Sequence, residues 1–258
     1  MKIPVVIFCG GAGSRMKEET EFRPKPMVSL GGKPILWHVM KIYSHYGFNR
    51  FIIALGYKGD YIKDYFINRE YFENDFSLKT KTGKKVLHKN IRRKKDDFDI
   101  TFVNTGLETP TGDRLVKVKK YLKSELFMVT YGDGVSNIDI SDLLRFHKKK
   151  KLIGTITGVH PKSKWGIIIS DKNGVVKRFQ EKPRFNQYTN GGFMVFTKRV
   201  FEYLKNGDMI HDAFPQLAKD GQLSVYLHEG YWGALDTYQD VEEMNKQWKK
   251  DPIWKAWR

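Results

Sequence analysis

Apolar runs alternate with amphipathic segments along the first 150 residues. Residues 3–9 form one continuous apolar run, Ile-Pro-Val-Val-Ile-Phe-Cys, which is typical of a strand covered on both faces in a parallel sheet. In residues 34–46 the apolar side chains recur at helical spacing, with a proline at the start and Gly47 after the end, so a helix is expected. This order predicts an α/β fold with a mostly parallel sheet flanked by helices. Further strands are expected at 51–55, 100–103 and 126–130, and further helices at 59–68, 114–123 and 140–149.

After residue 150 the pattern changes to shorter strands separated by turn residues. The segment Asp171-Lys172-Asn173-Gly174 suits a tight hairpin turn between two of these strands. The second part of the chain is therefore expected to form a smaller β-rich region. Its strands are predicted at 153–159, 166–170, 175–181, 192–196 and 223–228, and its helices at 198–204, at 211–219 and from 237 onward.

Two segments do not follow this alternation of strands and helices. Residues 69–98 are polar, aromatic and strongly basic, and predict an excursion from the sheet rather than a core element. A connection of this length is often functional, and contact with another subunit is a second use for it. The aromatic, amphipathic segment 248–257 is expected to pack on the domain or on a neighbouring subunit.

Composition narrows the class of protein. A chain of 258 residues can bury a sizeable core and accommodates one α/β domain with a smaller appended region. No apolar run approaches 18 residues and no N-terminal leader pattern is present, so we expect no membrane partner and a cytoplasmic location. The single cysteine, Cys9, fits a reducing compartment and is expected to be a packed core residue rather than a nucleophile.

The net charge of +17 does not select a partner by itself. Nucleic acid, an anionic surface and an anionic small substrate are all compatible with it. No zinc-finger spacing, RNA-binding sheet motif or helix-turn-helix signature accompanies the charge, so we predict no nucleic-acid partner.

A glycine-rich loop follows the first strand and carries Gly10, Gly11, Gly13 and Arg15. Glycines in such a loop let several backbone N–H groups approach one anion, although glycines alone fit a plain turn equally well. Nearby, Lys25 stands between two prolines that restrict where its ammonium points. The loop matches neither the dinucleotide fingerprint nor the P-loop spacing, so it predicts a phosphate loop of another kind.

Two aspartates are candidate metal ligands. Asp133 follows the strand 126–130 and lies between two glycines, at the edge where parallel strands present ligands. Asp236 follows Trp232-Gly233, and its spacing fits a metal carboxylate and the N-cap of a helix starting at Thr237 equally well.

Three motifs in the second half supply groups suited to a phosphorylated, hydroxyl-rich acceptor. They offer a carboxylate, an ammonium, an amide and exposed backbone. Each of them alone also fits an ordinary strand end or hairpin. The motifs are Trp165-Gly166, Glu181-Lys182-Pro183 and Asn190-Gly191-Gly192.

Together these motifs resemble the sugar-1-phosphate nucleotidyltransferases, most of all the members that use CTP and glucose 1-phosphate. The resemblance covers nearly the whole chain and includes residues 31–38, 56–59, 104–106 and 232–237. It implies a Rossmann-like fold, Mg²⁺ as cofactor, and transfer of a cytidylyl group from CTP to a sugar 1-phosphate. The motifs that carry it are Gly10-Gly11-x-Gly13-x-Arg15, Pro24-Lys25-Pro26, Thr111-Gly112-x-Arg114, Tyr131-Gly-Asp133-Gly, Phe179-Gln-Glu181-Lys182-Pro and Asn190-Gly-Gly-Phe.

The resemblance also implies a role for individual residues. Asp133 and Asp236 would bind Mg²⁺, and Arg15, Lys25 and Asp133 would carry the catalysis. The triphosphate and nucleotide would be bound by Gly10, Gly11, Gly13, Arg15, Lys25, Thr111, Gly112 and Arg114. The acceptor would be bound by Gly166, Glu181, Lys182 and Asn190.

The resemblance further implies one nucleotidyltransferase domain over residues 1–258 and a homo-oligomer. Residues 1–150 would form its nucleotide-binding part, 151–236 its acceptor-binding part and 237–258 a C-terminal helical tail. One departure concerns the segment His160-Pro-Lys-Ser-Lys164, which is more basic than the resemblance leads us to expect. A different nucleotide or phosphorylated acceptor, and a catalytically silent binding protein on the same fold, are the alternative interpretations.

Overall fold

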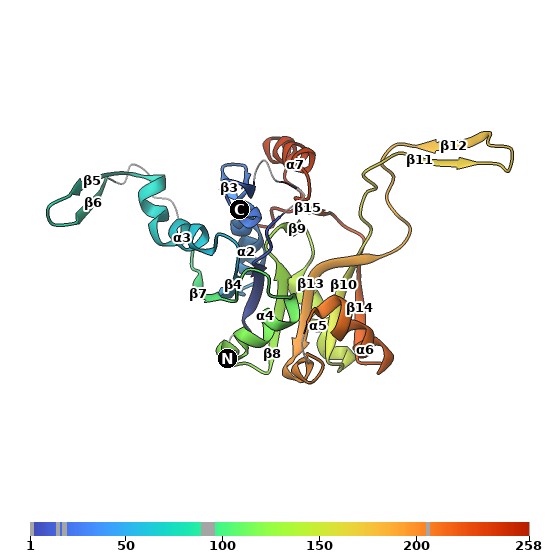
Figure 1. The fold of residues 1–258 in the computed structure, drawn as a ribbon, viewed down its shortest axis with the longest axis horizontal. Coiled ribbons are helices and arrows are strands. Elements are labelled where there is room, and N and C mark those ends of the chain that lie inside the picture. The colour runs from blue at the N-terminus through green and yellow to red at the C-terminus, as the bar shows by residue number, and fades with distance from the viewer. Residues whose placement is uncertain (1–2, 14–15, 17–19, 89–95, 205–206, 258) are drawn as a thin grey trace.

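The computed structural model describes residues 3–13, 16, 20–88, 96–204 and 207–257, and a seven-stranded sheet lies at its centre (Figure 1). The strand order is β14-β10-β13-β8-β1-β4-β7. Strands β8, β1, β4 and β7 are parallel neighbours, and β10 and β14 pair in parallel. Only β13 among the seven runs antiparallel to its neighbours. The strands are β1 (Val5–Cys9), β4 (Arg50–Leu55), β7 (Asp99–Asn104), β8 (Leu126–Tyr131), β10 (Gly154–Val159), β13 (Thr189–Thr197) and β14 (Leu223–His228).

Helices cover both faces of this sheet, so the predicted α/β class is confirmed. Successive residues of a strand point to opposite faces. Val5 and Ile7 of β1 accordingly join the core on one face, with α2, α5 and α7, whereas Val6 and Phe8 join the core on the other, with α4 and α6. The helices are α2 (Ile35–His45), α3 (Gly59–Glu73), α4 (Thr111–Val118), α5 (Ile140–Lys150), α6 (Phe214–Lys219) and α7 (Tyr238–Lys250).

Several helix boundaries differ from prediction. Helix α4 begins at Thr111, directly after Pro110, and ends at Val118, where a 3-10 turn (η3, Lys119–Tyr121) replaces it. The helix predicted at 198–204 is also a 3-10 helix (η4, Lys198–Glu202). The helix predicted at 211–219 begins as a π-helical turn (η5, Met209–Ala213) that continues into α6. Helix α3 extends five residues beyond its predicted end at residue 68, to Glu73.

Two hairpins extend away from the sheet on opposite sides of the molecule (Figure 1). The predicted excursion at 69–98 contains one of them, formed by β5 (Asp75–Lys79) and β6 (Lys84–His88). The other joins β11 (Ile167–Ser170) to β12 (Val176–Gln180) through the turn predicted at Asn173-Gly174. Of the other strands after residue 150, β10, β13 and β14 extend the central sheet itself, and β15 (Trp232–Ala234) forms a separate short pair.

The aromatic segment after α7 packs back onto the domain. Trp254 is fully buried and stacks on Tyr231 and Trp248. It reaches His38 of α2 on the same side of the sheet. In the described part of the chain, every helix is too short or too polar to cross a membrane.

Candidate active site

A short strand pair fixes the two candidate metal ligands beside each other. Strand β9 (Gly134–Ser136) follows Asp133, and β15 (Trp232–Ala234) precedes Asp236. The two strands are antiparallel with Gly134 opposite Ala234, and Leu235 N–H donates to the carbonyl of Asp133 over 2.9 Å. This pairing brings together two carboxylates that are far apart in the sequence.

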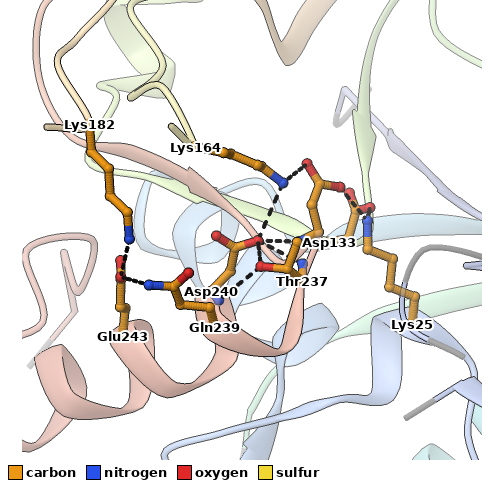
Figure 2. A network of polar contacts seen from close by, with 9 residues as sticks. Lys25, Asp133, Lys164, Lys182, Thr237, Gln239, Asp240 and Glu243 are labelled. Atoms are coloured by element: carbon orange, nitrogen blue, oxygen red, sulfur yellow. Dashed lines mark hydrogen bonds and ion pairs between the residues drawn. The ribbon is translucent and has the colours of Figure 1, made fainter. Parts of the chain in front are cut away.

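Lys25 lies between these carboxylates (Figure 2). Its Nζ is 2.7 Å from Asp133 Oδ2 and 2.8 Å from Asp236 Oδ1, and its side chain is only 15% exposed. The 3-10 turn η2 (Lys25–Met27) carries it, with a proline on either side as predicted to stiffen the segment. Burial alone would lower the pKa of Lys25, but the charges and hydrogen bonds of Asp133 and Asp236 outweigh burial and raise that pKa. Lys25 is therefore a firmly charged ammonium at the carboxyl edge of the sheet.

The same two carboxylates fit Mg²⁺. This ion is usually held by one or two protein carboxylates together with phosphate oxygens and water. Asp133 and Asp236 both reach the single Nζ atom of Lys25, so their oxygens already converge on one cation. Within the residues that the structure describes, no group of three or more His, Cys, Asp or Glu side chains forms a metal site made by the protein alone.

The other reading of Asp236, as a helix N-cap, is wrong. The N-cap of α7 is Thr237, whose Oγ1 accepts from Asp240 N–H, while Asp240 Oδ2 accepts from Thr237 N–H over 2.7 Å. This capping box satisfies the first turn of the helix without Asp236. Asp236 is thereby left to face Lys25.

The glycine-rich loop is only partly described, since Arg15 lies outside the described residues. Gly13 has φ +66°, a conformation that favours glycine. A Cβ atom at position 10 would lie 2.0 Å from Arg114 Nη1, so any larger residue would displace the guanidinium of Arg114. Among the residues that the structure describes, a Cβ atom at position 11 would meet nothing within 4 Å.

The side chain of Arg114 supports the backbone of this loop. Its guanidinium is buried and donates to the carbonyls of Gly10, Gly106 and Leu107, and to Thr105 Oγ1 over 2.6 Å. The resemblance implies that Arg114 lies next to the nucleotide. The contacts in the structure show instead that Arg114 positions the backbone of the loop.

Thr111 and Gly112 lie at the start of α4 and contact the segment before η5. Thr111 Oγ1 donates to Asp208 Oδ2 over 2.8 Å, and a Cβ atom at position 112 would lie 2.5 Å from the carbonyl of Gly207. Thr111 and Gly112 therefore hold the segment at residues 207–208 close to the start of α4. Their contact with a nucleotide stays a prediction.

The candidate acceptor residues gather around the β11–β12 hairpin and β13. A Cβ atom at position 166 would lie 3.0 Å from Glu181 Oε2, so Gly166 and Glu181 are neighbours. Asn190 Oδ1 accepts from Gly192 N–H over 3.0 Å, and Trp232 Nε1 donates to the carbonyl of Gly191 over 2.8 Å. The second contact ties the Asn190 motif to β15, the strand that leads to Asp236.

Three further charged residues lie next to the predicted site: Asp240 and Glu243 on α7, and Lys164 before β11. Lys164 Nζ lies 3.5 Å from Asp236 Oδ2 and 3.6 Å from Asp240 Oδ2, and Lys182 Nζ lies 3.7 Å from Glu243 Oε1 (Figure 2). The Thr-x-x-Asp pattern of the capping box could have drawn attention to Asp240. Lys164 belongs to the unexpectedly basic segment 160–164, and no comparable local pattern marks Glu243.

Cys9 is buried at the end of β1, as predicted. Desolvation, followed by the charge of Asp133, raises the pKa of its thiol well above the usual value. A Cβ atom at position 132 would lie 2.7 Å from its sulfur, so Gly132 packs directly on it. A protonated, enclosed thiol of this kind is a poor nucleophile.

The chain is similar to known proteins in both sequence and fold. The family model described as Nucleotidyl transferase matches residues 4–251. The chain is 43% identical to a protein named probable glucose-1-phosphate cytidylyltransferase from Bacillus subtilis, over 98% of this chain and 99% of that one. It is 38% identical to the glucose-1-phosphate cytidylyltransferase of Salmonella typhimurium, over 98% of each chain. Among solved structures, HddC from Yersinia pseudotuberculosis has the same fold, with a TM-score of 0.68, 22% identity and coverage of 95% of this chain and 99% of that one.

Proposed function

Because this chain belongs to the nucleotidyl transferase family, we propose that it transfers a cytidylyl group from CTP to glucose 1-phosphate and releases pyrophosphate. The names of the relatives with 43% and 38% identity over nearly full length support this choice of substrates. In the structure, the observation that carries the proposal is the convergence of Lys25, Asp133 and Asp236 at the carboxyl edge of the sheet. This edge is where open α/β sheets bind their ligands.

The reaction requires little covalent chemistry from the protein. An oxygen of the acceptor phosphate attacks the α-phosphorus of CTP and forms the new P–O bond. The bond from that phosphorus to the bridging oxygen breaks, and pyrophosphate leaves with the electron pair. No protein nucleophile takes part, which agrees with the enclosed Cys9.

The residues of the site would act through charge and position. Lys25 offers a fixed ammonium to the oxygens of the transferred group, where charge accumulates in the transition state. Asp133 and Asp236 would hold Mg²⁺, which when bound neutralises triphosphate charge and orients the phosphates. Lys25 now balances those two carboxylates, and the same ammonium would contact the phosphate when the triphosphate is bound.

The substrates would lie on either side of this centre. We expect the backbone at Gly10, Gly11 and Gly13, with Arg15, to hold the triphosphate. We expect Gly166, Glu181, Lys182 and Asn190 to hold the sugar 1-phosphate. A homo-oligomer working in the cytoplasm, where nucleoside triphosphates are available, is also part of the proposal. Large apolar side chains exposed on both hairpins, such as Phe76 and Phe179, support the oligomer.

A pyrophosphate-release panel tests the proposal. The purified protein is assayed with Mg²⁺, each of the four ribonucleoside triphosphates and dTTP, against glucose 1-phosphate and several other sugar phosphates. We expect release with CTP and glucose 1-phosphate. Release only with UTP or dTTP would reject the cytidylyl assignment, and release with CTP and another sugar phosphate would change the acceptor. A protein that releases pyrophosphate with no pair would not be the proposed enzyme.

A further inference from the structure

The strand pair of β9 and β15, which brings Asp133 and Asp236 together, is short and contains two glycines. Three residue pairs form it, and Gly134 and Gly233 are among their members. A pair of strands outside a larger sheet is only marginally stable, and glycine-rich strands specify their register weakly. A slip of one residue would turn Asp236 to the opposite face of the pair, away from Lys25. The position of Asp236 therefore depends on contacts that fix the register of β15.

Asn137 makes such contacts at the end of the pair that lies opposite to Asp236. Its Oδ1 accepts from Tyr231 N–H over 2.7 Å, and its own N–H donates to the carbonyl of Tyr231 over 3.2 Å. A Cβ atom at position 230 would lie 2.4 Å from Asn137 Oδ1, so Gly230 lets the amide come this close. Asn137 and Tyr231 thereby continue the register of the strand pair by one residue on each side.

Ser136 and His228 bind the same turn. Ser136 is 1% exposed, and its Oγ donates to the carbonyl of Tyr231 over 2.7 Å. His228 Nε2 lies 3.0 Å from Asn137 Oδ1 and 3.1 Å from Ser136 Oγ. Because an amide oxygen can only accept, Nε2 carries the hydrogen of the imidazole. The proton of Ser136 is already donated to a carbonyl, so this contact with a histidine does not make Ser136 an activated nucleophile.

We propose that Asn137, Ser136 and His228 form a clasp that fixes the register of β15. The clasp thereby holds Asp236 beside Asp133. The inference rests on the proposed function, in which Asp236 binds Mg²⁺. The three members are positioning residues, because they act on Asp236 through the backbone of β15 and bind the turn before that strand.

Asn137→Leu tests the clasp, and Asn137→Asp is its matched counterpart. Leucine has a similar size but no acceptor, whereas aspartate keeps an acceptor oxygen. Asn137 is exposed, so neither variant disturbs the core. Loss of the bonds to Asn137 Oδ1 should raise the Mg²⁺ concentration for half-maximal pyrophosphate release about fivefold or more. High Mg²⁺ should restore turnover, because binding of the ion favours the ordered arrangement. Asn137→Asp should stay within about twofold of wild type.

Asn74→Leu is the control for a general loss of stability. Asn74 Nδ2 donates to the carbonyl of Glu70 over 2.8 Å at the end of α3, so this variant also loses a hydrogen bond between an asparagine and the backbone. Its Mg²⁺ requirement should equal that of wild type. A requirement raised as much as in Asn137→Leu would overturn the clasp, because the effect would then not be specific to β15.

Amide hydrogen exchange provides a readout that does not depend on activity. In the free protein, residues 231–236 should exchange about fivefold faster or more in Asn137→Leu and in Ser136→Ala, and at the wild-type rate in Asn137→Asp. Unchanged exchange in both of the first two variants would overturn the clasp and leave the proposed function standing. Faster exchange with an unchanged Mg²⁺ requirement would also overturn it, because the clasp would then not act on Asp236. If wild type releases no pyrophosphate, the proposed function fails, and exchange alone decides the clasp.

Discussion

Lys25 contacts two carboxylates that lie 108 and 211 residues further along the chain, at 133 and 236. The sequence identified all three residues as candidates, because glycines and prolines mark the loops that carry them. It could not show that they meet, since the meeting depends on the pairing of β9 with β15. It also left Asp236 undecided between metal ligand and helix cap, and the position of Thr237 at the N-cap excludes the cap.

At Asp133 we expect the substitution Asp133→Asn to lower metal-dependent turnover by about 10²-fold or more, the scale of losing one charged group from a preorganised site. The amide keeps the shape of the carboxylate but removes the charge that would hold Mg²⁺. The measurement is pyrophosphate release as a function of Mg²⁺ concentration. Asp60→Asn, at the exposed start of α3, is the control for an unspecific charge effect. Turnover close to that of wild type would show that Asp133 is not a metal ligand.

Unlike Asp133, the enclosed residue Cys9 is expected to have no role in turnover. Cys9→Ala should retain turnover within about threefold, because a buried thiol with a raised pKa has no part in the chemistry. Native wild-type protein should also react slowly with a thiol reagent and rapidly once unfolded in urea. Rapid labelling of native protein, or a variant without activity that is still folded, would contradict this view.

Among the elements, the buried strands were the easiest to predict. Apolar runs such as 3–9 and 126–130 are long enough to identify a covered strand, and β1 and β8 lie there. Short helices were harder. The segment 198–204 has a helical pattern but folds as a 3-10 helix, since the local pattern does not encode how the turn packs on the sheet. The strand β13 was expected, but its insertion between β8 and β10 is a long-range pairing that no local signal specifies.

At the start of α7, the capping box gives an element-scale prediction. Thr237→Ala removes the hydroxyl that accepts from Asp240 N–H and donates to Asp240 Oδ2. The free energy of unfolding should fall by about 1 kcal/mol, measured by urea denaturation. Thr237→Ser keeps the hydroxyl and should preserve most of that stability. Equal stability of the alanine variant and wild type would mean that the cap does not hold the helix end.

At the scale of the whole molecule, two buried histidines are expected to make the stability of the fold depend on pH. His38 lies within the aromatic cluster of α2 and the C-terminal segment, and its Nε2 contacts the carbonyl of Leu30 at 2.7 Å. His147 lies in the last turn of α5 and contacts Thr155 Oγ1 at 2.8 Å. Burial lowers the pKa of each to about 4. Both histidines are therefore neutral in the folded protein at pH 7.

We expect acid to destabilise the protein through these groups. Their pKa values in the unfolded chain are about 6.5, so the unfolded state binds more protons between about pH 6.5 and pH 4. The stability that neutral histidines contribute is fully present above that range and is lost as pH falls through it, by at most about 1.4 kcal/mol per pH unit for each residue. Urea denaturation at pH 7 and pH 5 measures the loss. His38→Gln should reduce the pH dependence and His45→Gln, at the exposed end of α2, should not. A slope equal to that of wild type in the His38 variant would contradict the assignment.

The pairing of β9 with β15 also sets an order of events during synthesis. Lys25 and Asp133 leave the ribosome long before Asp236, and 211 residues separate the lysine from its second carboxylate. At about 5–20 residues per second, that interval lasts about 10–40 s. Asp133 is made partway through it, and for the remaining 103 residues the nascent chain carries the glycine-rich loop and the first carboxylate without the strand that completes the site. A growing chain therefore acquires activity as one late event, when β15 pairs with β9, and not gradually as the sheet is built.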